Sequence, residues 1–199
     1  MPPRRKGTFL QRCLLVTILA LALGGCGDDD DNPMKPPPGT SYPELSSPQN
    51  VLLALDLAYE SRDSVMYGAL YDSTYVGSST DLNDPGNPIN LTYADEVAHI
   101  RALATTPGIS HVLLDLGPEA TWDRLPSDDL SHPEWSMIQL AGSAYRIEIT
   151  EGATTLGAVG EAGTFLEFAF SPRPDSTSQT DTLWRIVRWR EVGNGSPSP

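Results

Sequence analysis

The chain has 199 residues, and its 13 Lys and Arg stand against 26 Asp and Glu, which gives a formal net charge of −13 at pH 7. This balance excludes nucleic acid and anionic lipid headgroups as favoured partners, because both are bound through basic side chains that neutralise phosphates. The chain is long enough for one domain with a sizeable core.

Residues 1–25 have the composition of a secretory signal peptide. A basic start is followed by an apolar stretch over residues 13–23, which is too short to span a bilayer unaided, and small residues then precede Cys26. Leu23-Gly24-Gly25-Cys26 resembles the bacterial lipoprotein box. The resemblance implies cleavage between Gly25 and Cys26 and acylation of Cys26, which inserts into a lipid bilayer. An ordinary signal peptide with a chance cysteine and an uncut anchor are the alternatives.

The predicted mature chain begins at Cys26 and is more acidic still. Cleavage removes four basic residues, so the charge becomes 9 − 26 = −17. Residues 26–46 are acidic and proline-rich and are predicted to form a tether. The domain is predicted over residues 47–192 and a disordered tail over 193–199. With Cys13 removed and Cys26 acylated, thiol chemistry and disulfides are excluded. We expect a lipid-anchored envelope protein, with the outer membrane favoured over the inner because Gly27, not aspartate, follows the cysteine.

Helices are predicted in the first half of the domain. Ser47-Pro48 is a typical helix start, and apolar residues then recur on one face, which predicts a helix over Pro48–Glu60. A second, shorter helix is expected after Asp63, because Tyr67, Leu70 and Tyr71 have helical spacing. Residues 77–90 are predicted to be a loop. Thr92 then opens a third helix, with Asp95 and Glu96 in its first turn and Ile100 and Leu103 on its apolar face.

Strands are predicted in the second half, where the apolar period changes to two. The predicted segments are residues 109–116, 143–150, 164–170 and 183–192, and the last two are expected to form a long hairpin. The fold class predicted is therefore α+β, with the N-terminal helices packed in the concavity of a curved antiparallel sheet.

The aromatic spacing resembles that of a known superfamily. Leu55-x3-Tyr59-x3-Asp63, followed by Tyr67, Leu70, Tyr71 and Tyr75, is similar to the opening helices of NTF2-like (SnoaL-like, cystatin-like cone) domains. Residues 184–191, WRIVRWRE, resemble the terminal strand of that superfamily. The resemblance covers residues 47–192, and more narrowly the chain is similar to uncharacterised bacterial lipoproteins that join such a domain to a lipoprotein box. It implies a cone-shaped pocket, but no catalytic residue can be carried over, because no residue set here matches the Asp, Asp/His or Tyr/Asp sets of the enzymes.

The candidate pocket residues are aromatic. Tyr59, Tyr67, Tyr71 and Trp184 are expected to line the cone. Trp184 and Trp189 are an odd number of positions apart, so they are predicted to face opposite sides of the last strand, one inward and one toward the outer face, where NTF2-like domains often form homodimers.

Arg185, Arg188 and Arg190 are the one charge feature above background. They are candidates for contact with an anion, and the alternative is cross-strand pairing with Glu148, Glu167 and Glu191. His99 on the third predicted helix is a candidate general base, and its alternative is a solvated or backbone-bonded imidazole. The three histidines lack metal-ligand spacing, so no metal site is predicted, and no cofactor is expected.

Three functions remain open at this point. The first is a non-catalytic envelope protein whose cone binds a small apolar or amphipathic ligand or a protein partner. The second is a purely structural protein that dimerises. The third is an isomerase, cyclase or hydratase of SnoaL-like type, which requires a buried carboxylate or histidine with a raised pKa that faces an accessible pocket.

Overall fold

The computed structural model describes residues 41–79, 89–160, 162–174 and 182–193 of the chain. The predicted signal peptide, its cleavage at Gly25 and Cys26, most of the tether and residues 194–199 lie outside these ranges. Within them, no helix is both long and apolar enough to cross a bilayer.

Three α-helices form where capping residues and apolar periodicity predicted them. Helix α2 (Pro48–Glu60) begins after Ser47, whose side chain accepts a hydrogen bond from the Asn50 amide. Helix α3 (Ser64–Leu70) begins after Asp63, which caps the amides of its first turn. Helix α4 (Tyr93–Thr105) begins with a capping box between Thr92 and Asp95. The predicted bounds of the first helix are confirmed.

The described strands form two sheets. One has the order β2-β1-β9-β8-β5-β4 and the other the order β3-β6-β7. Their bounds are β1 (Tyr71–Ser79), β2 (Ile89–Thr92), β3 (Ile109–Asp115), β4 (Asp123–Pro126), β5 (Ser136–Ala141), β6 (Arg146–Glu151), β7 (Thr154–Val159), β8 (Thr164–Pro174) and β9 (Thr182–Gly193). Two 3₁₀ turns, η1 (Glu119–Thr121) and η2 (Gly142–Ala144), connect strands.

The sheet differs from the prediction in three respects. Tyr71 and Tyr75 belong to strand β1 rather than to a helix, and β1 runs into the segment predicted as a loop. β1 pairs in parallel with β9, so the large sheet is mixed rather than antiparallel. The segment predicted as a strand over 143–150 begins only at Arg146, because residues 142–144 form the turn η2. The predicted hairpin of the last two strands is confirmed as β8 and β9.

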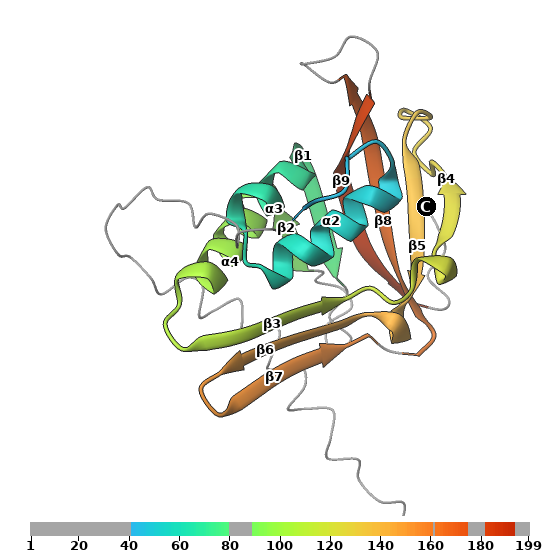
Figure 1. The fold of residues 1–199 in the computed structure, drawn as a ribbon. Coiled ribbons are helices and arrows are strands. Elements are labelled where there is room, and N and C mark those ends of the chain that lie inside the picture. The colour runs from blue at the N-terminus through green and yellow to red at the C-terminus, as the bar shows by residue number, and fades with distance from the viewer. Residues whose placement is uncertain (1–40, 80–88, 161, 175–181, 194–199) are drawn as a thin grey trace, which may run out of the picture.

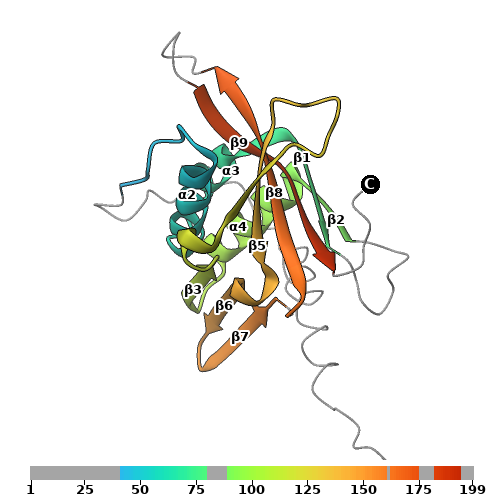
Figure 2. The same cartoon turned by 90° about the vertical axis from the view of Figure 1, so that its right-hand side faces the viewer.

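The helices lie against the concave side of the sheets, as Figures 1 and 2 show. α2 contacts β3 as well as β5 and β9, so it lies where the two sheets meet. One apolar core joins the helices to both sheets and contains Leu52, Tyr75, Ile138, Phe170 and Ile186, each at most 2% exposed. The α+β class and the helices in the concavity of a curved sheet are therefore confirmed.

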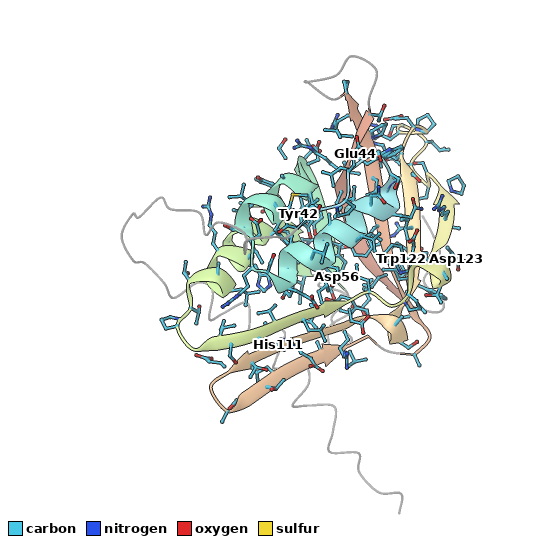
Figure 3. All side chains as sticks on the ribbon, in the orientation of Figure 1. Tyr42, Glu44, Asp56, His111, Trp122 and Asp123 are labelled. Atoms are coloured by element: carbon cyan, nitrogen blue, oxygen red, sulfur yellow. The ribbon has the colours of Figure 1, made fainter. Side chains whose placement is uncertain are left out.

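The packed chain begins before the predicted domain boundary at residue 47. The Trp184 amide donates a 2.8 Å hydrogen bond to the Leu45 carbonyl, and the Tyr42 hydroxyl donates a 2.9 Å bond to Asp63. Figure 3 labels Tyr42 and Glu44, which lie along α2. Residues 42–46 thus join the start of β9 to the junction of α2 and α3.

A β-bulge in the β8–β9 hairpin corrects the prediction for the two tryptophans. Ala169 pairs with Arg188 and Phe170 with Ile186, so Val187 is the additional residue. This residue shifts the alternation of β9 by one position. Trp184 and Trp189 consequently both pack against the main core, while Val187 packs in a small cluster with Met137 and Ala169. The prediction that the tryptophans face opposite sides is wrong.

Candidate functional site

A cavity of about 410 Å³ lies between the helices and the two sheets. The helices α2, α3 and α4 all contribute to its wall, and so do strands of both sheets. Most of the wall is apolar, because inward-facing leucine, isoleucine, valine and phenylalanine side chains alternate along the strands. Tyr145, Ile147 and Ile149, the alternating residues of the β6 region, all line it. The size and lining are those of a small-molecule site.

The predicted pocket residues divide into two groups. Tyr59, Tyr67 and Tyr71 line the cavity, whereas Trp184 does not and packs against the core elsewhere. Trp189 lines the cavity in its place, because the bulge at Val187 turns it inward.

Glu96 is the centre of a buried hydrogen-bond network at the cavity wall. Its Oε2 accepts a 2.9 Å bond from the Tyr67 hydroxyl, and its Oε1 accepts a 2.8 Å bond from Tyr75 and a 3.3 Å bond from Trp189 Nε1. The Tyr71 hydroxyl donates to Tyr67 at 3.0 Å and extends the network. Burial raises the pKa of Glu96, and the three donors oppose that rise.

His99 lies one helical turn after Glu96 and also lines the cavity. Its Nε2 is 3.0 Å from the Tyr59 hydroxyl, and the two rings are stacked. Burial lowers the pKa of His99 to about 4, so the imidazole is neutral at physiological pH. The pair therefore presents a neutral base and a hydroxyl to whatever occupies the cavity. The imidazole thus contacts a tyrosine side chain, which differs from the alternative of a solvated or backbone-bonded imidazole.

Tyr145 and Glu191 complete the polar part of the wall. Glu191 accepts a 2.9 Å bond from the Ser79 hydroxyl. Burial raises the pKa of Tyr145, and the charges of Glu96 and Glu191 raise it further. Tyr145, Glu96 and Glu191 all line the cavity, so two carboxyl groups share its wall with this hydroxyl.

The three candidate arginines lie away from this cavity. Arg190 pairs with Glu167 at 2.6 Å and with Asp128 at 2.7 Å, and Arg188 also pairs with Asp128. None of Arg185, Arg188 and Arg190 is among the residues that line the cavity. Of the predicted cross-strand partners, Glu167 is used by Arg190, while Glu148 pairs with Arg146 instead. Asp128, on the segment between β4 and β5, was not predicted as a partner.

Among the described residues, no cluster of three or more His, Cys, Asp or Glu has the arrangement of a metal site. His132 stacks on Trp135 and contacts Glu134 in an exposed turn.

Comparison with known proteins returns structures but no sequence family. No family model and no curated protein matches the chain. An NTF2-like protein with a cystatin-like fold from Novosphingobium aromaticivorans is 14% identical, with 74% of this chain and 80% of that chain covered and a TM-score of 0.41. An NTF2-like protein from Pseudomonas putida is 10% identical, with 72% and 82% covered and a TM-score of 0.39. A ketosteroid isomerase-like protein from Erwinia carotovora atroseptica is 14% identical, with 72% and 90% covered and a TM-score of 0.40. The fold class of this chain rests on the element and sheet order described above.

The central residue of the site was overlooked in the sequence, although a signal for it exists. Glu96 is four positions before Ile100 and seven before Leu103, both of which were assigned to the apolar face. That spacing places Glu96 on the same buried face. The prediction from sequence places Glu96 only in the first turn of the third helix and not among the candidate site residues.

Proposed function

We propose that the protein binds a small molecule with a mostly apolar body in this cavity. The observation that carries the proposal is the cavity itself: about 410 Å³ in volume, mainly apolar in its wall, with a few polar groups gathered around Tyr145, Glu96 and His99. Such a combination is typical of ligand sites. A purely structural domain would gain stability from side chains that fill this space.

The proposed location follows from the sequence. An acylated Cys26 would hold the domain near a membrane of the cell envelope through a short tether. A ligand with an apolar body partitions into that membrane, so an anchored domain meets it at high local concentration. The membrane anchor and the outer-membrane location are part of this proposal, and a homodimer stays a prediction.

A fluorescence titration tests ligand binding. The neutral dye N-phenylnaphthylamine brightens in apolar surroundings, and we expect saturable binding to the full-length chain carrying Cys26→Ser, which cannot be acylated. Ala158 lines the cavity, so Ala158→Trp should weaken binding about tenfold, which corresponds to roughly 60 Å² of lost apolar contact at about 25 cal/mol per Å².

Ala153→Trp is the matched control, because Ala153 is exposed in the turn between β6 and β7 and does not line the cavity. It should leave the affinity unchanged. Equal affinity of both tryptophan variants would place the dye outside the cavity and contradict the proposal.

A second candidate function is proton transfer on a bound carbonyl compound, and the Tyr59–His99 contact favours it. Glu96 is poorly suited as the base, since both its oxygens already accept hydrogen bonds. His99 would accept the proton at Nδ1, in the tautomer whose Nε2–H donates to the Tyr59 oxygen, and that bond orients the ring. Deuterium exchange at the α-carbon of cyclohexanone, followed by NMR, tests this function. Exchange should be lost in His99→Gln and kept in His111→Gln, a histidine that does not line the cavity; exchange that is equal in both variants would exclude it.

A further inference from the structure

The cavity carries negative but no positive side chains among the described residues that line it. Asp95, Glu96 and Glu191 contribute carboxyl groups, and the lining contains no lysine or arginine. His99 adds no positive charge, because burial keeps it neutral above about pH 4. Arg188 and Arg190 of β9 are paired with Asp128 and Glu167, and neither they nor Arg185 line the cavity. An anionic ligand would therefore enter a negative site without a partner.

Aromatic rings form much of the wall near these carboxylates. Tyr67 and Tyr71 have ring centroids 5.1 Å apart, and Tyr59 lies 6.0 Å from Tyr67. Further rings come from Tyr145, just before β6, from Phe168 on β8 and from Trp189 on β9. The faces of aromatic rings are negative, and several rings around one space attract an ammonium group, as in sites for quaternary ammonium ligands.

Several hydroxyl protons at or beside the wall are already used in hydrogen bonds within the protein. Tyr67 and Tyr75 donate to Glu96, and Tyr71 donates to Tyr67. Two of these protons are directed at Glu96 and the third at the Tyr67 hydroxyl. The wall consequently offers a ligand more acceptors and negative charge than donors, which suits a ligand that brings positive charge.

We infer that the cavity binds an organic cation, with an ammonium head beside Tyr145, Glu96 and Glu191 and an apolar body along Leu114, Ile147 and Ile149. This inference rests on the proposed ligand-binding function and names the class of its ligand. Neutral molecules of the same shape fill the apolar part but leave the charge of the carboxylates uncompensated.

Three ligands with one body separate the alternatives. Octyltrimethylammonium, octanol and octanoate share the octyl chain and differ in the charge of the head. With the full-length Cys26→Ser chain, calorimetric titration below the critical micelle concentrations should give an affinity for the cation about tenfold above that for octanol, and no measurable binding of octanoate. Equal affinities of cation and alcohol, or binding of octanoate, would overturn the inference.

Matched variants separate the cavity from the overall charge of the protein. Glu191→Gln and Glu148→Gln make the same change in net charge, but only Glu191 lines the cavity. Glu191→Gln should lower the preference for the cation several-fold, whereas Glu148→Gln should keep it. An equal reduction in both would assign the preference to the general field of an acidic protein and refute the site. Should Glu191→Gln fail to fold, the comparison of the three ligands on the Cys26→Ser chain with Glu191 intact decides.

The dye titration distinguishes the two failures. If N-phenylnaphthylamine and all three octyl ligands fail to bind, the proposed function itself fails. If the dye binds in the cavity and the cation has no advantage over octanol, only the inference about charge fails.

Discussion

The strongest prediction about stability concerns Asp56, on the side of α2 that faces β3. Figure 3 labels Asp56 above β3, together with His111 on that strand. The Asp56 Oδ1 atom is buried and makes no hydrogen bond in the structure. Burial and the nearby charges of Glu60 and Asp115 raise the pKa of Asp56 to about 7. Folding therefore disfavours the ionised carboxylate, and we expect Asp56→Asn to stabilise the protein at high pH.

The size of the expected gain follows from the difference between the pKa of Asp56 in the folded state and in the unfolded state. A pKa raised from 3.8 to about 7 corresponds to an upper limit of about 4 kcal/mol of destabilisation at alkaline pH. The side chain is only partly buried, and solvent screening reduces this to about 1–2 kcal/mol. Below about pH 3.8 the carboxyl group is protonated in both the folded and the unfolded state, so the raised pKa does not destabilise the fold there. Above pH 7 the group is ionised in both states, and the destabilisation is complete. The gain in Asp56→Asn should thus grow between these two pH values.

Urea denaturation at pH 4 and pH 8 measures this gain. Asp56→Asn should raise the free energy of unfolding by about 1–2 kcal/mol at pH 8 and by little at pH 4. Asp123→Asn is the control, because Asp123 is exposed on β4 and should show no pH-dependent gain. A loss of stability at pH 8, or the same gain at both pH values, would refute the assigned cause.

Three further substitutions test other parts of the fold by urea denaturation. Glu96→Ala leaves three buried donors without an acceptor, so it should lower the free energy of unfolding by about 3 kcal/mol or more, and a loss below about 1 kcal/mol would contradict the network. Gly160→Ala places a Cβ atom 2.0 Å from the Gly142 carbonyl oxygen and should lower the free energy of unfolding by about 1–3 kcal/mol. Gly193→Ala is the control, because its Cβ atom meets nothing within 4 Å, and it should leave the stability unchanged. Equal effects of the two substitutions would refute the close approach at Gly160. Asp128→Ala removes the carboxylate that Arg188 and Arg190 share and should lower the free energy of unfolding by about 1–3 kcal/mol. An unchanged urea midpoint would show that these ion pairs do not stabilise the fold.

The helices were predictable because local signals specify them. Ser47, Asp63 and Thr92 each accept backbone hydrogen bonds at a helix start, and such caps are visible in the sequence. The bounds of β1 were not predictable in the same way. Tyr71 continues the helical spacing of Tyr67 and Leu70, and its strand conformation is imposed by pairing with Ile186 in β9, which is distant in the sequence.

The geometry of β9 shows a second limit. Side chains between Trp184 and Trp189 alternate strictly between the two faces only if the strand has no bulge. The bulge at Val187 arises from the pairing of β9 with β8, so the residues of β9 alone do not reveal it. Pocket residues on the helices, such as Tyr59 and Tyr67, follow from helical periodicity alone. The contact of Tyr59 with His99 requires α2 and α4 to be neighbours, which neither helix encodes by itself.

A crystal structure of the Cys26→Ser chain grown with octyltrimethylammonium tests the central claim most directly. The account predicts density for the ligand inside the cavity, with its head beside Tyr145 and its chain against the apolar strand residues. A cavity that its own side chains have filled, or ligand density only on the outer surface, would contradict it.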